Sequence, residues 1–139
     1  MVSVERLLEE RLLKRIAPSR ERALKSLERS EKFLKDARNM FDKDLDEMTI
    51  LAVYESLFHA ARAVLFADGY AERSHYAICV YLREKRQDLG LREVNGLDLY
   101  RELRHSVAYG LDAKMTPKDS SEAINFAQEF LSAVKKTIK

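Results

Sequence analysis

Apolar side chains recur every three or four residues along most of this chain, which is the spacing that places them on one face of an α-helix. The clearest stripes run through residues 23–41 and 123–138. Residues 45–67 are apolar on nearly every side, as is typical of a helix in the middle of a bundle. The pattern therefore predicts an all-α fold with its most hydrophobic helix at the centre.

Helix start and stop signals divide this pattern into six segments. Ser3, Ser19 and Thr116 precede periodic segments as capping residues, and Pro117 occupies the first position of the last helix. Gly69 suits the left-handed end of the central helix. We expect helices at about residues 4–16, 19–41, 45–67, 74–89, 97–109 and 116–138, with a turn at Asn95-Gly96.

Loops of a few residues join the long segments, so they pack most simply as an up-and-down, four-helix-type bundle of five to six helices. A chain of 139 residues has the length of one domain with one core, and we expect a single domain over residues 1–139. The expected core residues are Leu27, Leu34, Leu57, Ala61, Leu103, Val107, Phe126, Phe130 and Val134.

Composition limits where such a protein can work. No apolar run reaches the roughly 18–20 residues of a membrane span, and the first residues contain no apolar signal core. The single cysteine, Cys79, lies in an apolar run and is expected to be buried and inert. A lone cysteine also suits a reducing compartment. We expect a cytoplasmic protein without membrane association.

The formal net charge of +2 is too small to indicate nucleic-acid binding by itself, but its distribution is uneven. Residues 1–38 contain eleven Lys and Arg against seven Asp and Glu, whereas residues 39–69 contain two against six. Such asymmetry can steer a polyanion or support self-association, and ordinary solvated helix faces explain it as well.

The expected fifth helix combines cations in a way that a plain bundle does not need. Arg101, Arg104 and His105 share one face, and Tyr109 lies near the end of the helix. Like charges at this spacing repel, so an anionic ligand or a carboxylate partner would stabilise them. The alternative is a solvated face on which Glu102 and other acids supply ion pairs.

Two further groups of polar residues are candidates for a site. Glu55, His59 and Arg62 form a polar stripe on the apolar central helix, which predicts either a cleft or interface where they satisfy one another or a purely structural ladder. Ser74 and His75 begin the expected fourth helix, where open backbone amides can bind an anion, although a serine there is often only a cap.

The sequence contains no pattern for a metal or a nucleotide cofactor. The three histidines lack the spacing of a metal-binding helix, and the glycines stand singly rather than in a phosphate-binding loop. We therefore expect neither a metal nor a cofactor.

Several segments together resemble the HEPN (higher eukaryotes and prokaryotes nucleotide-binding) family. Residues 54–69 resemble the family's central helix of small residues, and Ser74-His75 resembles its Ser/Thr-His pair. Residues 104–110, Arg-His-Ser-Val-Ala-Tyr-Gly, resemble the signature helix, and residues 116–138 resemble the last helix. The resemblance spans about residues 19–138.

This resemblance implies a helical bundle that forms a symmetric homodimer. In active members, an arginine, the polar residue after it and a histidine further along form a metal-independent ribonuclease site at the dimer interface. Arg104 matches the arginine and His105 matches the polar residue, but Tyr109, Gly110 and Leu111 occupy the possible histidine positions. Tyrosine is a poor base at neutral pH, so catalysis is in doubt.

Family members are also often partnered with a small nucleotidyltransferase, as toxin with antitoxin or as binding subunit with catalytic subunit. The first hypothesis is a dimer that binds RNA or a nucleotide and works with such a partner. The second is a ribonuclease using Arg104, His105 and Tyr109, and the third is a structural dimer without catalysis. Phosphate binding is expected at Arg101, Arg104, Ser74 and His75.

Overall fold

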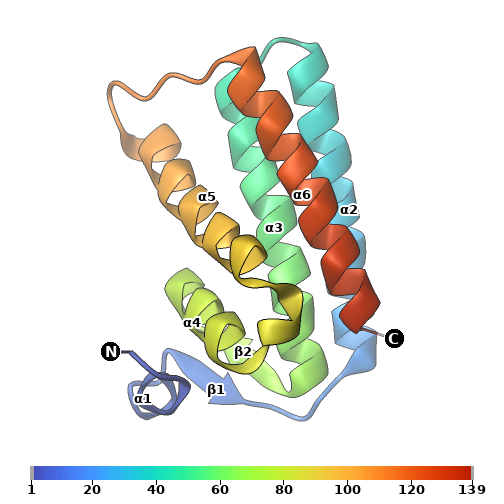
Figure 1. Cartoon of the computed structure of the whole chain (residues 1–139), viewed down its shortest axis with the longest axis vertical. Helices are drawn as coiled ribbons and strands as arrows, with labels where there is room; N and C mark the ends of the chain where they lie inside the picture. Colours follow the sequence, from blue (N-terminus) through green and yellow to red (C-terminus); the bar gives the residue numbers. More distant parts are fainter. Residues whose placement is uncertain (1, 139) are drawn as a thin grey trace.

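Three long helices lie side by side in the computed structural model, which describes residues 2–138 (Figure 1). They are α2 (Arg20–Asp42), α3 (Asp46–Asp68) and α6 (Pro117–Thr137). The helix α5 (Leu91–Tyr109) leans against α3, and α4 (His75–Lys85) lies below it in the view of Figure 1. The remaining elements are α1 (Val4–Glu9), β1 (Leu13–Arg15), β2 (Tyr70–Glu72) and the 3-10 turn η1 (Gln87–Leu89).

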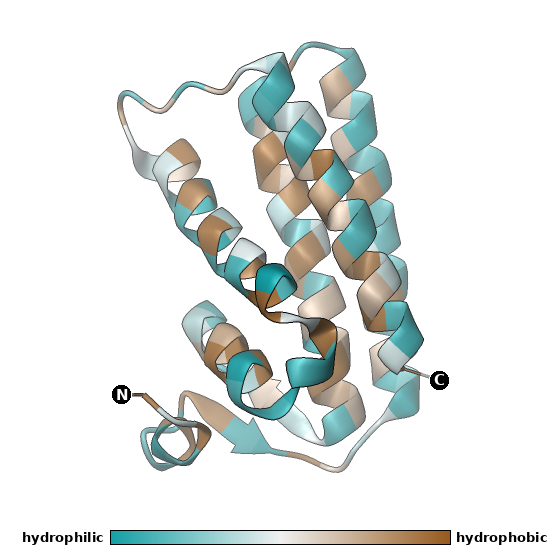
Figure 2. Cartoon of the chain, viewed as in Figure 1, coloured by the Kyte–Doolittle hydropathy of each residue, from teal (hydrophilic) through white to brown (hydrophobic). Residues whose placement is uncertain are grey.

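The helix α3 forms the centre of the bundle, as its all-round apolarity predicts. Fourteen of its 23 residues are buried, and its hydrophobic residues face the neighbouring helices (Figure 2). It is long and apolar enough to span a bilayer, but 72% of its most apolar stretch is buried within the fold. Its hydrophobicity is therefore explained by its place in the core.

Small hydroxyl residues bring α2 and α3 close together. Ser30 Oγ donates to the Ser56 carbonyl at 2.7 Å, and Ser56 Oγ donates to the Ser30 carbonyl at 2.9 Å. Ser26 Oγ donates to the His59 carbonyl at 2.6 Å. These buried hydroxyls are fully paired, so the two backbones approach each other without unsatisfied polar groups.

Three predicted helix ends are confirmed. Ser19 Oγ accepts from the Arg22 amide at 3.1 Å at the start of α2. Thr116 and Asp119 form a reciprocal capping box in front of α6. Gly69 ends α3 at φ 97°, and a Cβ there would come within 3.0 Å of the Ile16 carbonyl oxygen.

The expected first helix over residues 4–16 is wrong, because α1 ends at Glu9. Arg11 adopts a left-handed backbone with φ 61°, and the chain then extends into β1. This strand pairs antiparallel with β2, with Leu13 opposite Glu72. The pairing satisfies backbone hydrogen-bonding groups of both short strands. A helix as short as α1 is only marginally stable by itself, so it does not continue through these residues.

The middle of the chain also differs from the prediction. The helix α4 stops at Lys85, and η1 fills the expected end of that helix. The next helix begins at Leu91 rather than Leu97, so Asn95 and Gly96 lie inside α5 instead of forming a turn. A Cβ at Gly96 would come within 2.2 Å of the Phe126 ring, so this glycine allows α5 and α6 to pack closely.

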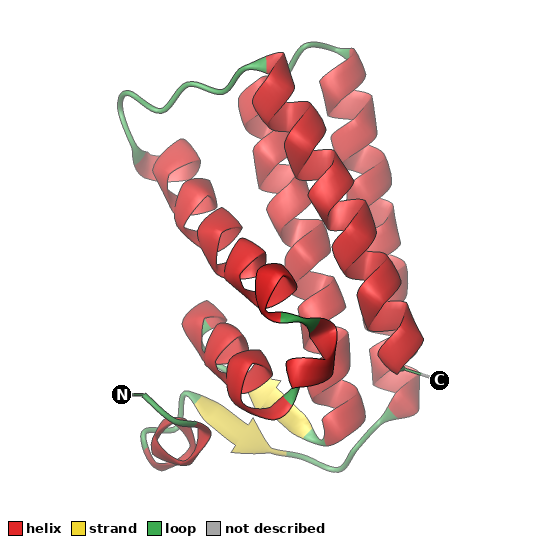
Figure 3. Cartoon of the chain, in the orientation of Figure 1, coloured by secondary structure: helices red, strands yellow, loops and turns green. Residues whose placement is uncertain are grey.

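The all-α class is confirmed, with one small two-stranded sheet at one end of the molecule that the sequence did not predict (Figure 3). Six of the nine expected core residues are buried. Leu103, Val107 and Phe126 are instead half-buried against the core. Leu103 and Val107 lie on the second half of α5, which has no buried residue, and Phe126 lies on α6, where its ring packs against Gly96 and Tyr100 of α5.

Candidate functional site

A cavity of about 600 Å³ lies between α3, α4 and α5, and it joins two of the three groups predicted from the sequence. The helix α5 supplies Arg101, Arg104 and His105, and the start of α4 supplies His75. These residues are distant in the chain and meet because α4 and α5 both pack on α3. The lining consists of Tyr54, His75, Arg101, Glu102, Arg104, His105 and Ser106.

The two arginines of this cavity differ in their partners. Arg101 binds the Asp98 carboxylate through Nε at 2.9 Å and Nη2 at 2.8 Å. Arg104 lies 6.0 Å over the Tyr54 ring and makes no hydrogen bond or ion pair with any residue in the range 2–138. Arg104 is therefore the guanidinium that an anionic ligand could pair with, and Arg101 is already neutralised.

The imidazole of His75 is held by α3. Its Nδ1 lies 2.9 Å from the Tyr54 hydroxyl, and its ring stacks on Phe58 with centroids 4.3 Å apart. Burial and then the nearby Arg104 lower the pKa of His75, and these effects outweigh the opposing influence of Glu55 and Glu72. At neutral pH the ring is uncharged, so it can either donate or accept a hydrogen bond in the cavity.

Ser74 occupies the capping position of α4, as the sequence predicts. Its hydroxyl makes no capping hydrogen bond to the helix that it precedes. The first amides of α4 are thus not occupied by this side chain, and they lie directly beside His75.

The polar stripe on α3 does not form a three-residue ladder. Arg62 binds the Glu72 carboxylate of β2 through two hydrogen bonds of 2.7 and 3.2 Å, instead of pairing with Glu55 or His59. The sequence did not show this pairing because Glu72 approaches only through the β2 strand. Arg62 is therefore a structural link between α3 and the small sheet.

His59 is enclosed between helices α2 and α3. Its ring is parallel to that of Phe33 at 5.5 Å, and the Glu55 carboxylate lies 3.8 Å from its Nε2. Burial, followed by the charges of Arg62 and Arg29, lowers the pKa of His59 to about 4. The imidazole is uncharged at neutral pH, so its contact with Glu55 is not an ion pair under those conditions.

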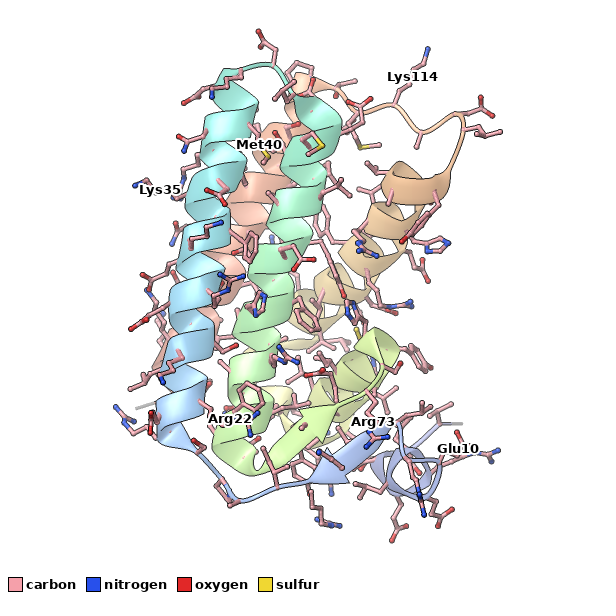
Figure 4. All side chains as sticks on the ribbon, turned by 180° about the vertical axis from the view of Figure 1, so that it is seen from behind. Glu10, Arg22, Lys35, Met40, Arg73 and Lys114 are labelled. Atoms are coloured by element: carbon pink, nitrogen blue, oxygen red, sulfur yellow. The ribbon has the colours of Figure 1, made fainter. Side chains whose placement is uncertain are left out.

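A second, smaller groove of about 240 Å³ adjoins Arg104. Its walls come from α2, α3 and α5 and are mostly apolar, with Glu55 and Arg104 as the charged groups besides Asp36. Met40, which is labelled in Figure 4, marks the α2 side of this groove. The full lining is Phe33, Asp36, Met40, Met48, Leu51, Ala52, Glu55, Arg104 and Ala108.

The end of α5 projects His105 and Tyr109 toward solvent. Their ring centroids are 5.0 Å apart, and Tyr109 is 67% exposed. His105 also lines a shallow hollow of about 490 Å³ that includes Tyr109 and the loop of residues 110–113. Tyr109 is therefore accessible, but it does not line the cavity that contains Arg104 and His75.

Sequence reasoning missed Tyr54 as a site residue and treated it only as part of the apolar helix. The residue is 2% exposed, and its hydroxyl reaches the cavity through the contact with His75. Burial raises the pKa of Tyr54 well above its usual value, so the phenol stays protonated. A buried tyrosine usually needs a polar partner, and that requirement was the available signal.

No group of three or more His, Cys, Asp or Glu side chains within residues 2–138 is arranged to hold a metal ion. Cys79 is buried as predicted, and burial raises the pKa of its thiol to about 12. A thiol in this state is a poor nucleophile at neutral pH. The polar groups that line the cavity are two guanidiniums, two imidazoles, the Glu102 carboxylate and the hydroxyls of Tyr54 and Ser106.

Comparisons with known proteins identify the family of this chain. The model of the HEPN domain matches residues 23–137, which is most of the chain. The chain is also similar to a UPF0332 protein of Archaeoglobus fulgidus, with 26% identity over 114 residues that cover 81% of this chain and 91% of the relative. At the level of the family, this relation supports a role connected with nucleotides or RNA. The chain belongs to the HEPN domain family.

Proposed function

We propose that this protein binds RNA or a nucleotide, with a phosphate group held by Arg104. The observation that carries this proposal is the unpaired guanidinium of Arg104, placed over Tyr54 in a cavity with the uncharged imidazole of His75. A volume of about 600 Å³ lies within the range of small-molecule sites. Arginine matches phosphate oxygens with two parallel hydrogen bonds, which explains the choice of ligand.

We also propose that two copies pair across the groove beside Arg104. The groove presents apolar side chains, and the nearby Met48 is 47% exposed. Covering it with a second copy would remove this apolar surface from water. We call the cavity of about 600 Å³ that contains Arg104 and His75 the phosphate cavity. Because Arg104 and Glu55 both line the groove, a twofold pairing would bring the two phosphate cavities toward the same interface.

A small nucleotidyltransferase is the partner that the family relation suggests for this dimer. Tyr109 is the proposed point of regulation by that partner, because its hydroxyl is on an exposed side chain near the end of α5. Transfer of a nucleotidyl group from a nucleoside triphosphate to this hydroxyl, with release of pyrophosphate, would add bulk and negative charge close to His105. We place the complex in the cytoplasm.

A ribonuclease is the second candidate, favoured by the position of His105 in the same cavity as Arg104. In this scheme Arg104 would stabilise the negative charge that develops on the non-bridging phosphate oxygens. His105 would take the proton of the attacking 2′-hydroxyl as the bond from phosphorus to the leaving 5′-oxygen breaks, and a proton would return to that oxygen. The family's histidine is replaced in this chain, and Tyr109 lies outside the cavity. Binding is therefore the preferred function, with weak cleavage or none.

Binding is tested with labelled RNA and nucleotide in buffer containing EDTA. Replacing Arg104→Ala should weaken both affinities by about 1.5–3 kcal/mol, the range for hydrogen bonds to charged groups. Arg92→Gln is the matched control, because Arg92 is on the same helix but pairs with Glu129 at 3.0 Å. Unchanged affinity in a folded Arg104→Ala protein would mean that this arginine has no ligand role.

Pairing is tested by light scattering across micromolar concentrations. The wild type should have about twice the 16.1 kDa mass of one chain. Met48→Glu should shift it toward the monomer, because a carboxylate in an apolar interface must be desolvated. Leu91→Glu is the control, since Leu91 is 66% exposed and does not line this groove. A monomeric wild type would contradict the proposal.

A further inference from the structure

A further cavity, of about 370 Å³, lies at the end of the molecule where α1 meets the small sheet. Four of the six residues that line it are cations: Arg11, Lys14, Arg15 and Arg73. Arg11, Lys14 and Arg15 precede the part of the chain that matches the family model, which begins at residue 23. We call these four residues the basic cluster.

The backbone explains how the basic cluster is assembled. The left-handed conformation of Arg11, with φ 61°, turns the chain from α1 into β1. The Arg73 amide then donates to the Leu12 carbonyl at 2.9 Å, which fixes Arg73 beside the start of β1. Figure 4 labels Arg73 at this end of the molecule, next to the N-terminal segment. Leu13 is buried below, while Lys14 and Arg15 remain exposed.

None of the four cations has a carboxylate within 4.0 Å among residues 2–138. The polar contact of Arg15 is with the Tyr70 hydroxyl at 2.9 Å. Neighbouring acids are engaged elsewhere: Glu10 pairs with Arg6, and Glu72 pairs with Arg62. Four unopposed positive charges around one cavity repel each other and concentrate anions from solution.

The basic cluster is also continuous with the phosphate cavity along the chain. Arg73 is followed directly by Ser74, whose hydroxyl makes no cap bond, and then by His75, which lines the phosphate cavity. A ligand that occupies both places must carry negative charge at several points along its length. A mononucleotide is too short to supply these charges, but a polynucleotide backbone supplies one at each residue.

We infer that the basic cluster binds the phosphodiester backbone of a single-stranded RNA whose other contact is at Arg104. This inference rests on the proposed function and extends it from a phosphate ligand to a polynucleotide. Three of the four cations are arginines, and one guanidinium can donate two parallel hydrogen bonds to the oxygens of one phosphate. An acidic protein would match the charge of the basic cluster but not the cavity at Arg104, which is built for a single anionic group beside imidazole and phenol.

The test compares a single-stranded oligo(U) of roughly 16 nucleotides with a labelled mononucleotide, by fluorescence anisotropy at several KCl concentrations. The triple variant Arg11→Gln/Lys14→Gln/Arg73→Gln should bind the oligonucleotide about tenfold more weakly or worse. The slope of log affinity against log salt should fall by about 2, because three phosphate contacts are lost at roughly 0.7 each. Its affinity for the mononucleotide should equal that of the wild type.

The matched control removes the same charge from exposed lysines outside the basic cluster, Lys35→Gln/Lys43→Gln/Lys136→Gln. It should change the oligonucleotide affinity and salt slope far less than the triple variant does. Thermal unfolding followed by circular dichroism verifies that both variants fold. Equal losses in the two variants would overturn the inference, because they would reflect net charge alone.

The remaining outcomes separate this inference from the proposed function. If Arg104→Ala weakens the affinity for the oligonucleotide and the triple variant leaves it unchanged, the role of the basic cluster is overturned and that of the phosphate cavity is supported. The reverse result would support the basic cluster and overturn the role of Arg104. Binding of neither ligand by the wild type would overturn both. Tighter binding of a polyglutamate peptide than of oligo(U) by the basic cluster would also overturn the inference.

Discussion

The helices α3 and α5 have similar lengths but different relations to the core. Fourteen of the 23 residues of α3 are buried, whereas only Val94 and Leu97 are buried among the 19 residues of α5. Both buried residues of α5 lie in its first half. Its second half, from Leu99 onward, rests on the bundle only through half-buried side chains such as Leu103 and Val107.

This difference explains where the charged groups of the site can be placed. A charged side chain on the largely buried part of α3 needs a partner, and Arg62 finds one in Glu72. Arg104 on the second half of α5 remains unpaired at low cost because water still reaches it. The bundle therefore supplies a rigid wall, including Tyr54 and His75, and α5 supplies the charge that a ligand would meet.

The largest expected effect comes from removing a core side chain. Phe130 on α6 is completely buried, so Phe130→Ala should lower the free energy of unfolding by about 3–5 kcal/mol. Val107→Ala on α5 should cost only about 1 kcal/mol, because its two lost carbon groups are half-buried. Urea unfolding at fixed protein concentration measures both. Equal losses would contradict the contrast between the bundle and α5.

A pH titration tests His59, the histidine that α3 places against Phe33 of α2. The folded pKa of His59 is about 4 against 6.5 for the free side chain, so the unfolded chain gains a proton first as pH falls. The free energy of unfolding is therefore unaffected by this group above pH 6.5, where the ring is neutral in both states. It falls by up to about 3 kcal/mol as the pH drops from 6.5 to 4, because the unfolded chain binds the proton first. Urea unfolding across this interval should show a smaller loss for His59→Phe than for the wild type.

Phenylalanine keeps the ring that stacks on Phe33, so this variant removes the titration without removing the packing. Leu99→Gln on the exposed part of α5 is the control, because Leu99 is 62% exposed and carries no titratable group, and it should retain the pH dependence of the wild type. An identical pH dependence in the wild type and His59→Phe would show that His59 does not contribute to it.

The smallest expected effect concerns cleavage of RNA. The wild type should cleave weakly or not at all in EDTA, because the family's histidine is absent. Tyr109→His restores the family's spacing from Arg104 and should raise cleavage modestly, with little change in unfolding free energy, since the side chain is 67% exposed. Gel analysis of labelled RNA measures this. Strong wild-type cleavage that persists in His105→Ala would contradict the proposed chemistry.

Several features followed directly from the sequence. The central position of α3, the cap at Ser19 and the capping box at Thr116 depend on residues within a few positions of one another. Helical periodicity also put Arg101, Arg104 and His105 on one surface of α5, and all three line the same cavity. These features are local, because helix geometry fixes which side chains at a given spacing are neighbours.

The partners of those side chains were decided by the tertiary structure. Arg62 binds Glu72 because β2 pairs with β1, and Tyr54 reaches His75 because α4 packs against α3. Gly96 was predicted as a turn, yet it lies within α5, where the absence of a Cβ leaves room for the Phe126 ring of α6. Spacing along a helix determines which side chains share a surface, whereas the segment that covers this surface depends on the packing energy of the whole chain.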